Sequence, residues 1–214
     1  MPRASRAEAQ QHRQQVIDHT SRLIREKGAD QVSVPQAMAA AGLTHGGFYR
    51  HFSSKDDLIA QALLAAFTER RQAMDRLVDQ EREQDREQDS GQGQADRSAR
   101  AEYLARYLST LHLDRPGDGC PAVTLAADAA RAEPGAPIRT AFTDGLRDLV
   151  DGFQQLTDGA DAETDRGTAL VELSTLVGAV LLARATDDAD LSHEILDSAR
   201  RYFGVPDSPD PAGM

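Results

Sequence analysis

The stretch SVPQAMAAAGLTHGGFYRHFSSKDDLI, residues 33–59, contains two short runs of helix-forming residues that a glycine separates. Ser33 can cap the first helix, which we expect to run to about Ala40 with a proline tolerated in its first turn. Gly42 ends that helix, and Thr44 can cap the second one. Two short helices joined by a turn that contains glycine predict a helix-turn-helix motif.

Gly46 and Gly47 stand where the second helix begins, and they raise the question of what the motif binds. A glycine inside a helix costs about 1 kcal/mol relative to alanine, so two in a row need a compensating role. Without side chains at this end, the backbone can approach phosphates or base edges closely, and a helix N-terminus favours anions. The second helix of such a motif enters the DNA major groove N-terminus first, so DNA is the predicted partner.

Polar and basic side chains surround the two glycines and supply the predicted contacts to double-stranded DNA. Thr44 and His45 can reach base edges, whereas Tyr49, His51 and Lys55 can hold phosphates on either side of the groove. We expect the two phenylalanines of the stretch to lie in the core. The predicted DNA-binding residues are Ser33, Val34, Thr44, His45, Gly46, Gly47, Tyr49, His51 and Lys55. The alternative is a helical interaction module without DNA binding, in which the glycines form only a loop.

Charge is distributed unevenly along the 214 residues. The net charge is −11, yet residues 1–51 carry seven Arg and Lys against four Asp and Glu, a net of +3. The remainder therefore carries −14. A basic end on an acidic body indicates a polyanion-binding module joined to a second part, with chance asymmetry as the alternative.

Helical periodicity extends over the whole chain and runs of β-branched residues are missing, so we predict an all-α fold of about nine helices without strands. Residues 1–53 are expected to form a three-helix DNA-binding domain, and residues 54–203 a larger helical domain. The polar run 79–100 is predicted to be a helix end that passes into a flexible loop, and 204–214 a disordered tail.

Apolar residues at spacings of three and four mark one buried face in each predicted long helix. These residues are Val16, Ile17, Leu23 and Ile24 before a stop at Gly28; Ile59, Leu63, Phe67, Met74 and Leu77 after a cap at Ser54; Tyr103, Leu104, Tyr107, Leu108 and Leu111; Ile138, Phe142, Leu146, Leu149 and Phe153; and Leu191, Ile195, Leu196, Ala199, Tyr202 and Phe203. A short helix is expected to begin at Pro121. Residues 165–185 are apolar on nearly all sides, so we expect this helix to be buried all round.

Composition and motifs argue against several classes of protein. The single cysteine excludes an internal disulfide framework and fits a reducing compartment. The polar start lacks the apolar region of a secretory signal, and residues 169–185 contain Glu172 and are short for a membrane span, so a cytoplasmic protein is predicted. There is no phosphate-binding loop, hydrolase elbow or HExxH motif, and the six histidines show no metal-ligand spacing. We therefore expect no enzyme, no metal and no cofactor.

The stretch 33–59 resembles the DNA-binding signature of the TetR family of transcriptional regulators. That signature has Thr or Ser opening its second helix, Ala-Gly at the turn, Tyr-x-His-Phe closing the third helix and Ser-Lys-x-x-Leu opening the fourth. The matching residues are Ser33, Ala41, Gly42, Tyr49, His51, Phe52, Ser54, Lys55 and Leu58. Arg13, Ile17 and Gly28 also stand where the family's first helix would have them.

The resemblance implies a homodimer that binds a palindromic operator, most often as a repressor that a small-molecule effector releases. The last two long helices would dimerise, and the apolar helix 165–185 agrees, because an interface can cover such a helix. The predicted interface residues are Leu176, Gly178, Val180, Leu181, Ile195, Ala199 and Tyr202. The alternative for this helix is a purely intramolecular core.

An effector pocket is expected among the helices of the larger domain. Tyr103 and Tyr107 lie one turn apart and can offer hydroxyls in an apolar setting, which suits a small and largely apolar ligand. The predicted ligand-binding residues are Phe67, Tyr103, Tyr107, Cys120, Phe142, Leu146 and Phe153.

Cys120 directly precedes Pro121 at a predicted helix N-terminus, a position that would favour the thiolate. A redox sensor based on Cys120 is therefore an alternative function, although a packed small residue is the favoured interpretation. His112 or His193 could serve as a base for a nucleophilic cysteine, but nothing in the sequence orients such a pair.

Overall fold

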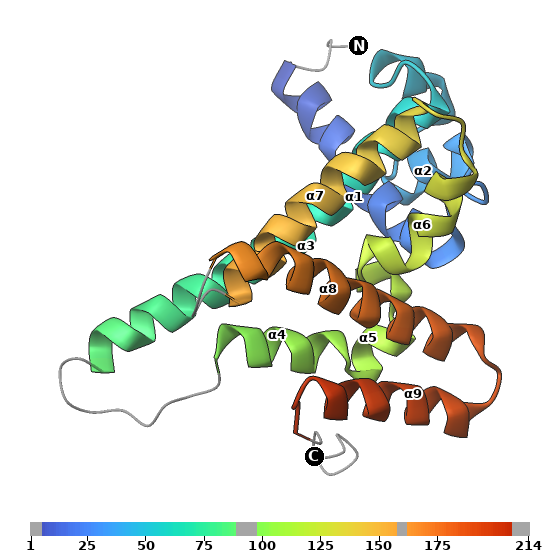
Figure 1. Ribbon diagram of the computed structural model, residues 1–214. Helices are drawn as coiled ribbons and strands as arrows, with labels where there is room; N and C mark the ends of the chain where they lie inside the picture. Colours follow the sequence, from blue (N-terminus) through green and yellow to red (C-terminus); the bar gives the residue numbers. More distant parts are fainter. Residues whose placement is uncertain (1–5, 89–97, 158–161, 207–214) are drawn as a thin grey trace, which may run out of the picture. The chain divides into compact units, whose positions relative to one another are not determined.

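The computed structural model describes residues 6–88, 98–157 and 162–206, and within these ranges every regular element is a helix (Figure 1). The elements are α1 (Arg6–Lys27), α2 (Val34–Ala40), the 3-10 helix η1 (His45–Arg50), α3 (Lys55–Gln88), α4 (Ala99–Tyr107), α5 (Thr110–Asp114), the 3-10 helix η2 (Pro116–Asp118), α6 (Pro121–Arg131), α7 (Pro137–Thr157), α8 (Ala162–Ala185) and α9 (Ala189–Tyr202). The predicted all-α fold is therefore confirmed. Residues 89–97 of the predicted flexible run and 207–214 of the predicted tail lie outside the described residues.

The chain divides into two compact units, which share two long helices. Unit 1 contains the residues up to Glu69 together with Arg115–Asp148, and unit 2 contains Arg70–Asp114 and the residues from Leu149 onward. The helices α3 and α7 each contribute to both units. Unit 1 therefore contains α6 as well as the helix-turn-helix segment.

Local signals in the sequence set the helix ends of unit 1. After α1, Gly28 has φ +85°, in the left-handed region that glycine adopts without strain, and the helix stops there. At the start of α2, Ser33 Oγ accepts from the Gln36 N–H at 3.4 Å, and Gln36 Oε1 accepts from the Ser33 N–H at 2.9 Å. This is a capping box. At the start of α3, Ser54 Oγ accepts from the Asp57 N–H at 3.0 Å. These predicted helix ends are confirmed.

The second helix of the motif differs from the prediction. It is the short 3-10 helix η1, and although Thr44 occupies its N-cap position, the Thr44 hydroxyl makes no cap hydrogen bond. Helix propensity explains the difference, because two glycines at its start disfavour a full α-helix. Phe48 and Phe52 hold η1 in place, since both side chains are buried and their rings stack at a centroid distance of 5.5 Å. Their predicted core role is confirmed.

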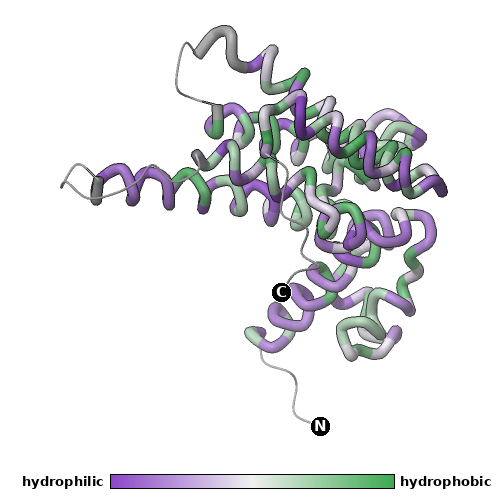
Figure 2. The backbone as a smooth tube through the Cα atoms, turned by 90° about the horizontal axis from the view of Figure 1, so that it is seen from below, coloured by the Kyte–Doolittle hydropathy of each residue, from purple (hydrophilic) through white to green (hydrophobic). Residues whose placement is uncertain are grey.

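Helix α3 follows its predicted pattern closely. The five residues predicted for its buried face are all buried, namely Ile59, Leu63, Phe67, Met74 and Leu77. Beyond Val78 the helix continues to Gln88, and its described residues from Asp79 onward are hydrophilic (Figure 2). The first part of the run predicted to pass into a loop is therefore helical.

In unit 2, the predicted buried face of α4 is confirmed except at its end. Tyr103, Leu104, Tyr107 and Leu108 are buried, whereas Leu111 is 59% exposed. The prediction for Leu111 is wrong because α4 ends at Tyr107 and the chain turns into α5, which takes Leu111 out of line with the α4 face. From α9, Arg200 Nε donates to the Leu108 carbonyl at 3.0 Å and satisfies a backbone acceptor after α4.

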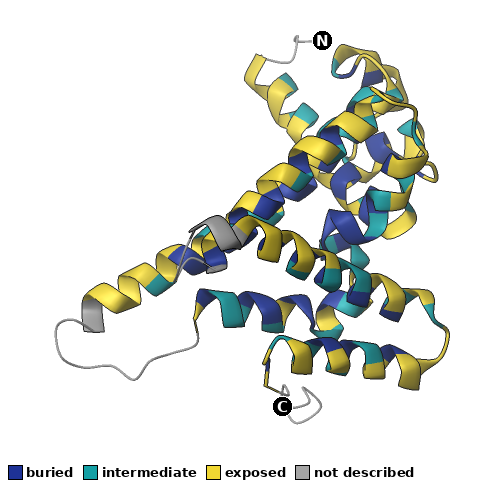
Figure 3. Ribbon diagram, in the orientation of Figure 1, coloured by how far each residue is buried: buried dark blue, intermediate teal, exposed yellow. Residues whose placement is uncertain are grey.

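Helix α8 was predicted to be buried on all sides, but it is buried on one side only (Figure 3). The buried side carries Ala169, Leu173, Leu176, Val180 and Ala183, and the exposed side carries Leu170, Val171, Leu181 and Leu182. The alternative of a purely intramolecular core is therefore wrong, because the chain's own helices cover only one face of α8. Burial of the other face in a dimer stays a prediction. By length and composition alone, Arg166–Ala185 could cross a membrane. Its contacts instead tie it to unit 2, through Arg100 and Glu172 at 2.7 Å and through Ser192 Oγ, which donates to the Ala183 carbonyl at 2.8 Å.

Candidate nucleic-acid interface

The helix η1 presents its polar residues to solvent because its apolar residues are anchored. Phe48 is buried, and its ring meets the ring of Tyr49 edge-on at 5.1 Å. With Phe48 pointing into unit 1, Tyr49 points outward and is 78% exposed. Thr44 and His45 are exposed as well. Three of the predicted DNA-binding side chains are therefore accessible at one short element.

The two adjacent glycines of η1 have no structural requirement within the chain. Neither has a positive φ, and a Cβ atom added at Gly46 would meet nothing within 4 Å. At Gly47 it would meet only the Met38 methyl group at 3.8 Å, an ordinary contact. Gly42 differs, because its φ of +70° favours glycine by itself. Open space in front of Gly46 fits the prediction that a partner's backbone approaches there.

His51 lies at the end of η1 among other basic groups. Burial lowers the pKa of His51, and the positive charges of His12, Arg13 and Arg50 lower that pKa further. Arg13 Nε donates to the His51 carbonyl at 3.3 Å, and its guanidinium lies 5.3 Å from the centre of the Phe52 ring. Side chains from α1 and η1 thus form a basic cluster of His12, Arg13, Arg50 and His51.

Three members of this basic cluster, His12, Arg13 and Arg50, were not among the predicted DNA-binding residues. The sequence carried a signal for Arg50, because this basic residue follows Tyr49 directly; in the structure its side chain is exposed. His12 and Arg13 reach His51 only through the packing of α1, and Arg13 stands 38 residues from His51 in sequence. Their proximity therefore had no local signal.

The remaining predicted DNA-binding residues have visible roles within the chain. Ser33 is exposed but its hydroxyl caps α2, and Val34 next to it is half-buried. Lys55 is half-buried in the first turn of α3, and its Nζ donates to the Asp30 carbonyl at 3.3 Å. Lys55 thereby links α3 to the loop before α2. Contacts of Ser33, Val34 and Lys55 with DNA stay predictions.

The predicted ligand-binding residues are divided between the two units. Phe67, Cys120, Phe142 and Leu146 belong to unit 1, and Tyr103, Tyr107 and Phe153 belong to unit 2. Within each unit they pack as aromatic pairs: Phe67 meets Phe142 at 5.5 Å, and Tyr103 meets Phe153 at 5.8 Å. A shallow hollow on α8, lined by Leu170, Val171, Ser174 and Thr175, includes none of them. The predicted effector site stays a prediction.

The predicted interface residues differ in their exposure. Leu176, Val180 and Ala199 are buried within the chain, so their side chains serve its own core and are not available to a second copy. Gly178 and Ile195 are half-buried, while Leu181 and Tyr202 are exposed. Four exposed apolar residues were missed, namely Leu170, Val171 and Leu182 on α8 and Leu191 on α9. Their helical spacing was visible, but the sequence does not say which side of α8 faces outward.

Comparison with known proteins assigns the N-terminal segment. Residues 16–62 match the model of the family described as bacterial regulatory proteins, tetR family. The chain is 38% identical over 61 residues to the HTH-type transcriptional regulator AcrR of Shigella flexneri, a match that covers 28% of each chain. It is 33% identical over 81 residues to the HTH-type transcriptional regulator TtgR of Pseudomonas putida, which covers 38% of each chain. These matches span about a third of the length of those curated relatives.

Solved structures extend the likeness in fold to most of the chain. A TetR transcriptional regulator from Chloroflexus aurantiacus has a TM-score of 0.65 at 21% identity, covering 92% of this chain and 96% of that one. The reduced form of NemR from E. coli has a TM-score of 0.64 at 20% identity, covering 89% and 96%. At these identities the likeness concerns the fold.

Proposed function

Because this chain is a member of the TetR family, we propose that it is a transcriptional regulator that binds operator DNA through η1 and the basic cluster. The observation that carries the proposal is the open surface at Gly46, where no neighbouring atom of the chain requires glycine. Exposed Thr44, His45 and Tyr49 beside it supply donors and acceptors for bases and phosphates. The protein acts in the cytoplasm, where its DNA is.

Footprinting and gel-shift titrations on the DNA upstream of the chain's own gene test this proposal. Arg50→Ala should weaken binding to all duplexes about equally and lower the salt slope by roughly one per subunit. Arg147→Ala is the charge-matched control, because Arg147 lies on α7 with its side chain 68% exposed. Thr44→Ala or His45→Ala should instead change base preference. The absence of any footprint on upstream DNA with the wild-type protein would favour the alternative interaction module.

A homodimer follows from the same proposal, with the exposed apolar side of α8 as its main contact. Val171, Thr175, Gly178 and Leu182 recur at spacings of four, three and four, which places them in one line along the helix. Val171 and Leu182, at the two ends of this line, are exposed apolar residues, and exposed apolar residues on one side of a helix indicate a covering partner. A second copy provides an identical stripe, and two-fold contacts of this kind are self-complementary. A palindromic operator would match that symmetry.

Effector control is the remaining part of the proposal. The two η1 helices of a dimer must be spaced to match the two half-sites of the operator. A ligand bound among the helices of the larger domain would release DNA if it bound more tightly to a form of the dimer in which this spacing does not match. Coupling of about 1–3 kcal/mol is typical of such systems, and operator DNA must weaken the ligand by the same factor. Calorimetry of candidate effectors with and without operator measures this factor. Equal affinities for every candidate drawn from neighbouring pathways would remove effector control from the proposal.

A further inference from the structure

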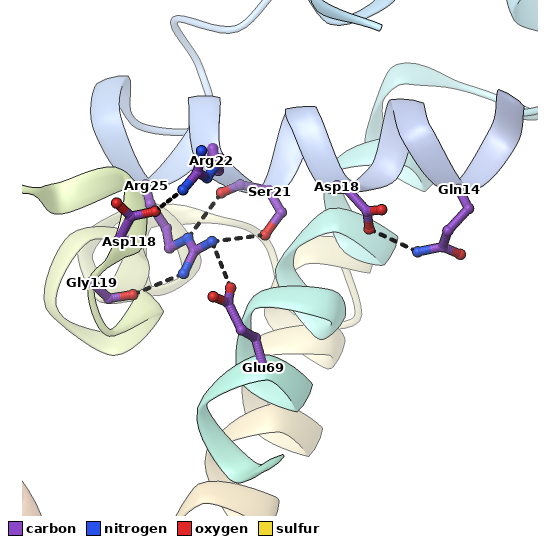
Figure 4. Close-up of polar contacts among 8 residues, drawn as sticks. All are labelled: Gln14, Asp18, Ser21, Arg22, Arg25, Glu69, Asp118 and Gly119. Carbon is purple, nitrogen blue, oxygen red and sulfur yellow. Dashed lines mark hydrogen bonds and ion pairs between the residues drawn. The ribbon is translucent and has the colours of Figure 1, made fainter. Parts of the chain in front are cut away.

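Arg25, near the C-terminal end of α1, is a buried arginine that joins three segments of unit 1 (Figure 4). It is only 2% exposed, and a charged side chain is rarely buried to that extent unless its donors are satisfied. Its Nε donates to the Ser21 carbonyl at 3.1 Å, one turn back in α1. Its Nη1 donates to the Gly119 carbonyl at 3.0 Å, and its Nη2 meets the Glu69 carboxylate at 2.8 Å. Helix α1 is thereby bonded to α3 and to the residue before the α6 cap.

Asp128 on α6 makes a second connection to the end of α1. Its Oδ2 accepts from the Ala29 N–H at 2.8 Å. The same oxygen lies so close to Gly28 that a Cβ atom there would be 3.3 Å away. Ala29 is buried and begins the loop from α1 to α2. Helix α6 therefore holds the backbone through which α1 connects to the helix-turn-helix.

Between these two connections, the backbone of Gly117 packs closely against a side chain of α1. A Cβ atom added at Gly117, in η2, would lie 2.9 Å from Glu26 Cγ, so η2 rests directly against α1. Arg22 also pairs with Asp118, and both side chains are well exposed. Residues 22–29, at the end of α1 and the start of the following loop, thus contact residues 117–119 and Asp128.

From these contacts we propose that residues 116–131 and the helix-turn-helix form one rigid arm, and that Arg25 and Asp128 are positioning residues for DNA recognition. This inference rests on the proposed function of η1. Displacement of α6 from α1 would leave the buried guanidinium without its Gly119 acceptor and the Ala29 N–H without a carboxylate. A buried polar group without a partner is costly, so states in which α6 has separated from α1 are strongly disfavoured. The arm therefore moves as a whole.

The arm reaches η1 through α1 itself. Arg13 of α1 donates to the His51 carbonyl at 3.3 Å and also bonds the Gln61 side chain on α3. A rotation of α1 would therefore shift the end of η1. The connection runs through packed and hydrogen-bonded groups, which is the physical condition for coupling between distant elements.

The test uses a duplex from the upstream region that the wild-type protein protects, and a shuffled duplex of the same length. Arg25→Met and Asp128→Ala should each weaken binding of the protected duplex roughly tenfold. The salt slope should not change, because the buried Arg25 side chain cannot reach a phosphate. Asp128→Asn keeps an acceptor oxygen and should bind like wild type. Arg147→Ala removes an exposed charge of α7 that takes no part in these contacts, and it should change the affinity by less than about twofold.

Hydrogen exchange provides a readout without DNA. Asp128→Ala should speed exchange of the amides in residues 29–52, and Asp128→Asn should not. Unchanged exchange, or unchanged affinity of folded Arg25→Met and Asp128→Ala despite a lower Tm, would overturn the rigid arm. A salt slope lowered by about one in Arg25→Met would make Arg25 a phosphate contact and overturn it too. If Arg25→Met does not fold, the comparison of Asp128→Ala with Asp128→Asn tests the rigid arm. Wild-type protein that protects no upstream DNA would instead overturn the proposed function.

Discussion

Replacing Gly145 by alanine should destabilise the protein, although alanine is the better helix former. Gly145 lies on α7 in unit 1, where the side chain of Phe67 from α3 packs against it. An added Cβ atom would lie 2.8 Å from the Phe67 Cβ atom, and two carbons of the Phe67 ring would be closer still. Ordinary carbon contacts begin at 3.4 Å, so Phe67 must move. Its Cβ atom is fixed to the backbone, and its buried ring is held edge-on against Phe142.

Two opposing effects set the size of the change. Alanine in place of glycine inside a helix stabilises by about 1 kcal/mol. Adding a methyl group to a packed core costs about 1–3 kcal/mol, and the upper end applies here because a backbone-bound carbon must shift. The net destabilisation is therefore about 2 kcal/mol. For a chain of this length, 1 kcal/mol corresponds to about 2–4 °C, so Tm should fall by about 4–8 °C.

Gly167→Ala on α8 is the matched control, because a Cβ atom there would meet nothing within 4 Å. This variant should gain only the higher helix propensity of alanine, which stabilises the fold by about 1 kcal/mol and raises Tm by about 2–4 °C. Thermal melts followed by circular dichroism at one protein concentration compare the two variants. The reasoning is refuted if Gly145→Ala is as stable as wild type or follows Gly167→Ala upward.

Three further predictions concern His112, α8 and Cys120. Burial lowers the pKa of His112 to about 4. The unfolded chain takes up this proton near pH 6.5, so stability should fall by about 2 kcal/mol from pH 7 to pH 5; urea titrations of His112→Asn should lack this loss. Leu182→Asp should give folded monomers in light scattering, whereas Val180→Asp, at a fully buried position, should unfold the subunit; a dimer retained by Leu182→Asp would move the interface elsewhere. Native Cys120, fully buried, should react with a thiol reagent only on unfolding, and Cys120→Ser should leave any oxidant response of DNA binding unchanged; rapid labelling of the native protein would revive the redox sensor.

The sequence by itself determined the helix ends around the helix-turn-helix and the resemblance of residues 33–59 to the TetR signature. The capping box of Ser33 and Gln36, the left-handed glycine at position 28 and the Ser54 cap were all predictable. Each depends on residues within four positions of one another, because a helix end must satisfy its own nearby backbone groups. The buried face of α3 was predictable for a related reason, since helical spacing places its apolar residues on one side.

Only the tertiary structure decided which residues meet. The periodicity of α8 showed that the helix is apolar, but the chain's own helices determine that Leu176 and Val180 face inward and Leu182 faces outward. Arg25 reads as an ordinary charged residue of an amphipathic helix, yet its acceptor on Gly119 lies 94 residues away. Hydrogen bonds and burial at such separations depend on how whole helices pack, and the spacing of residues along one helix carries no information about that.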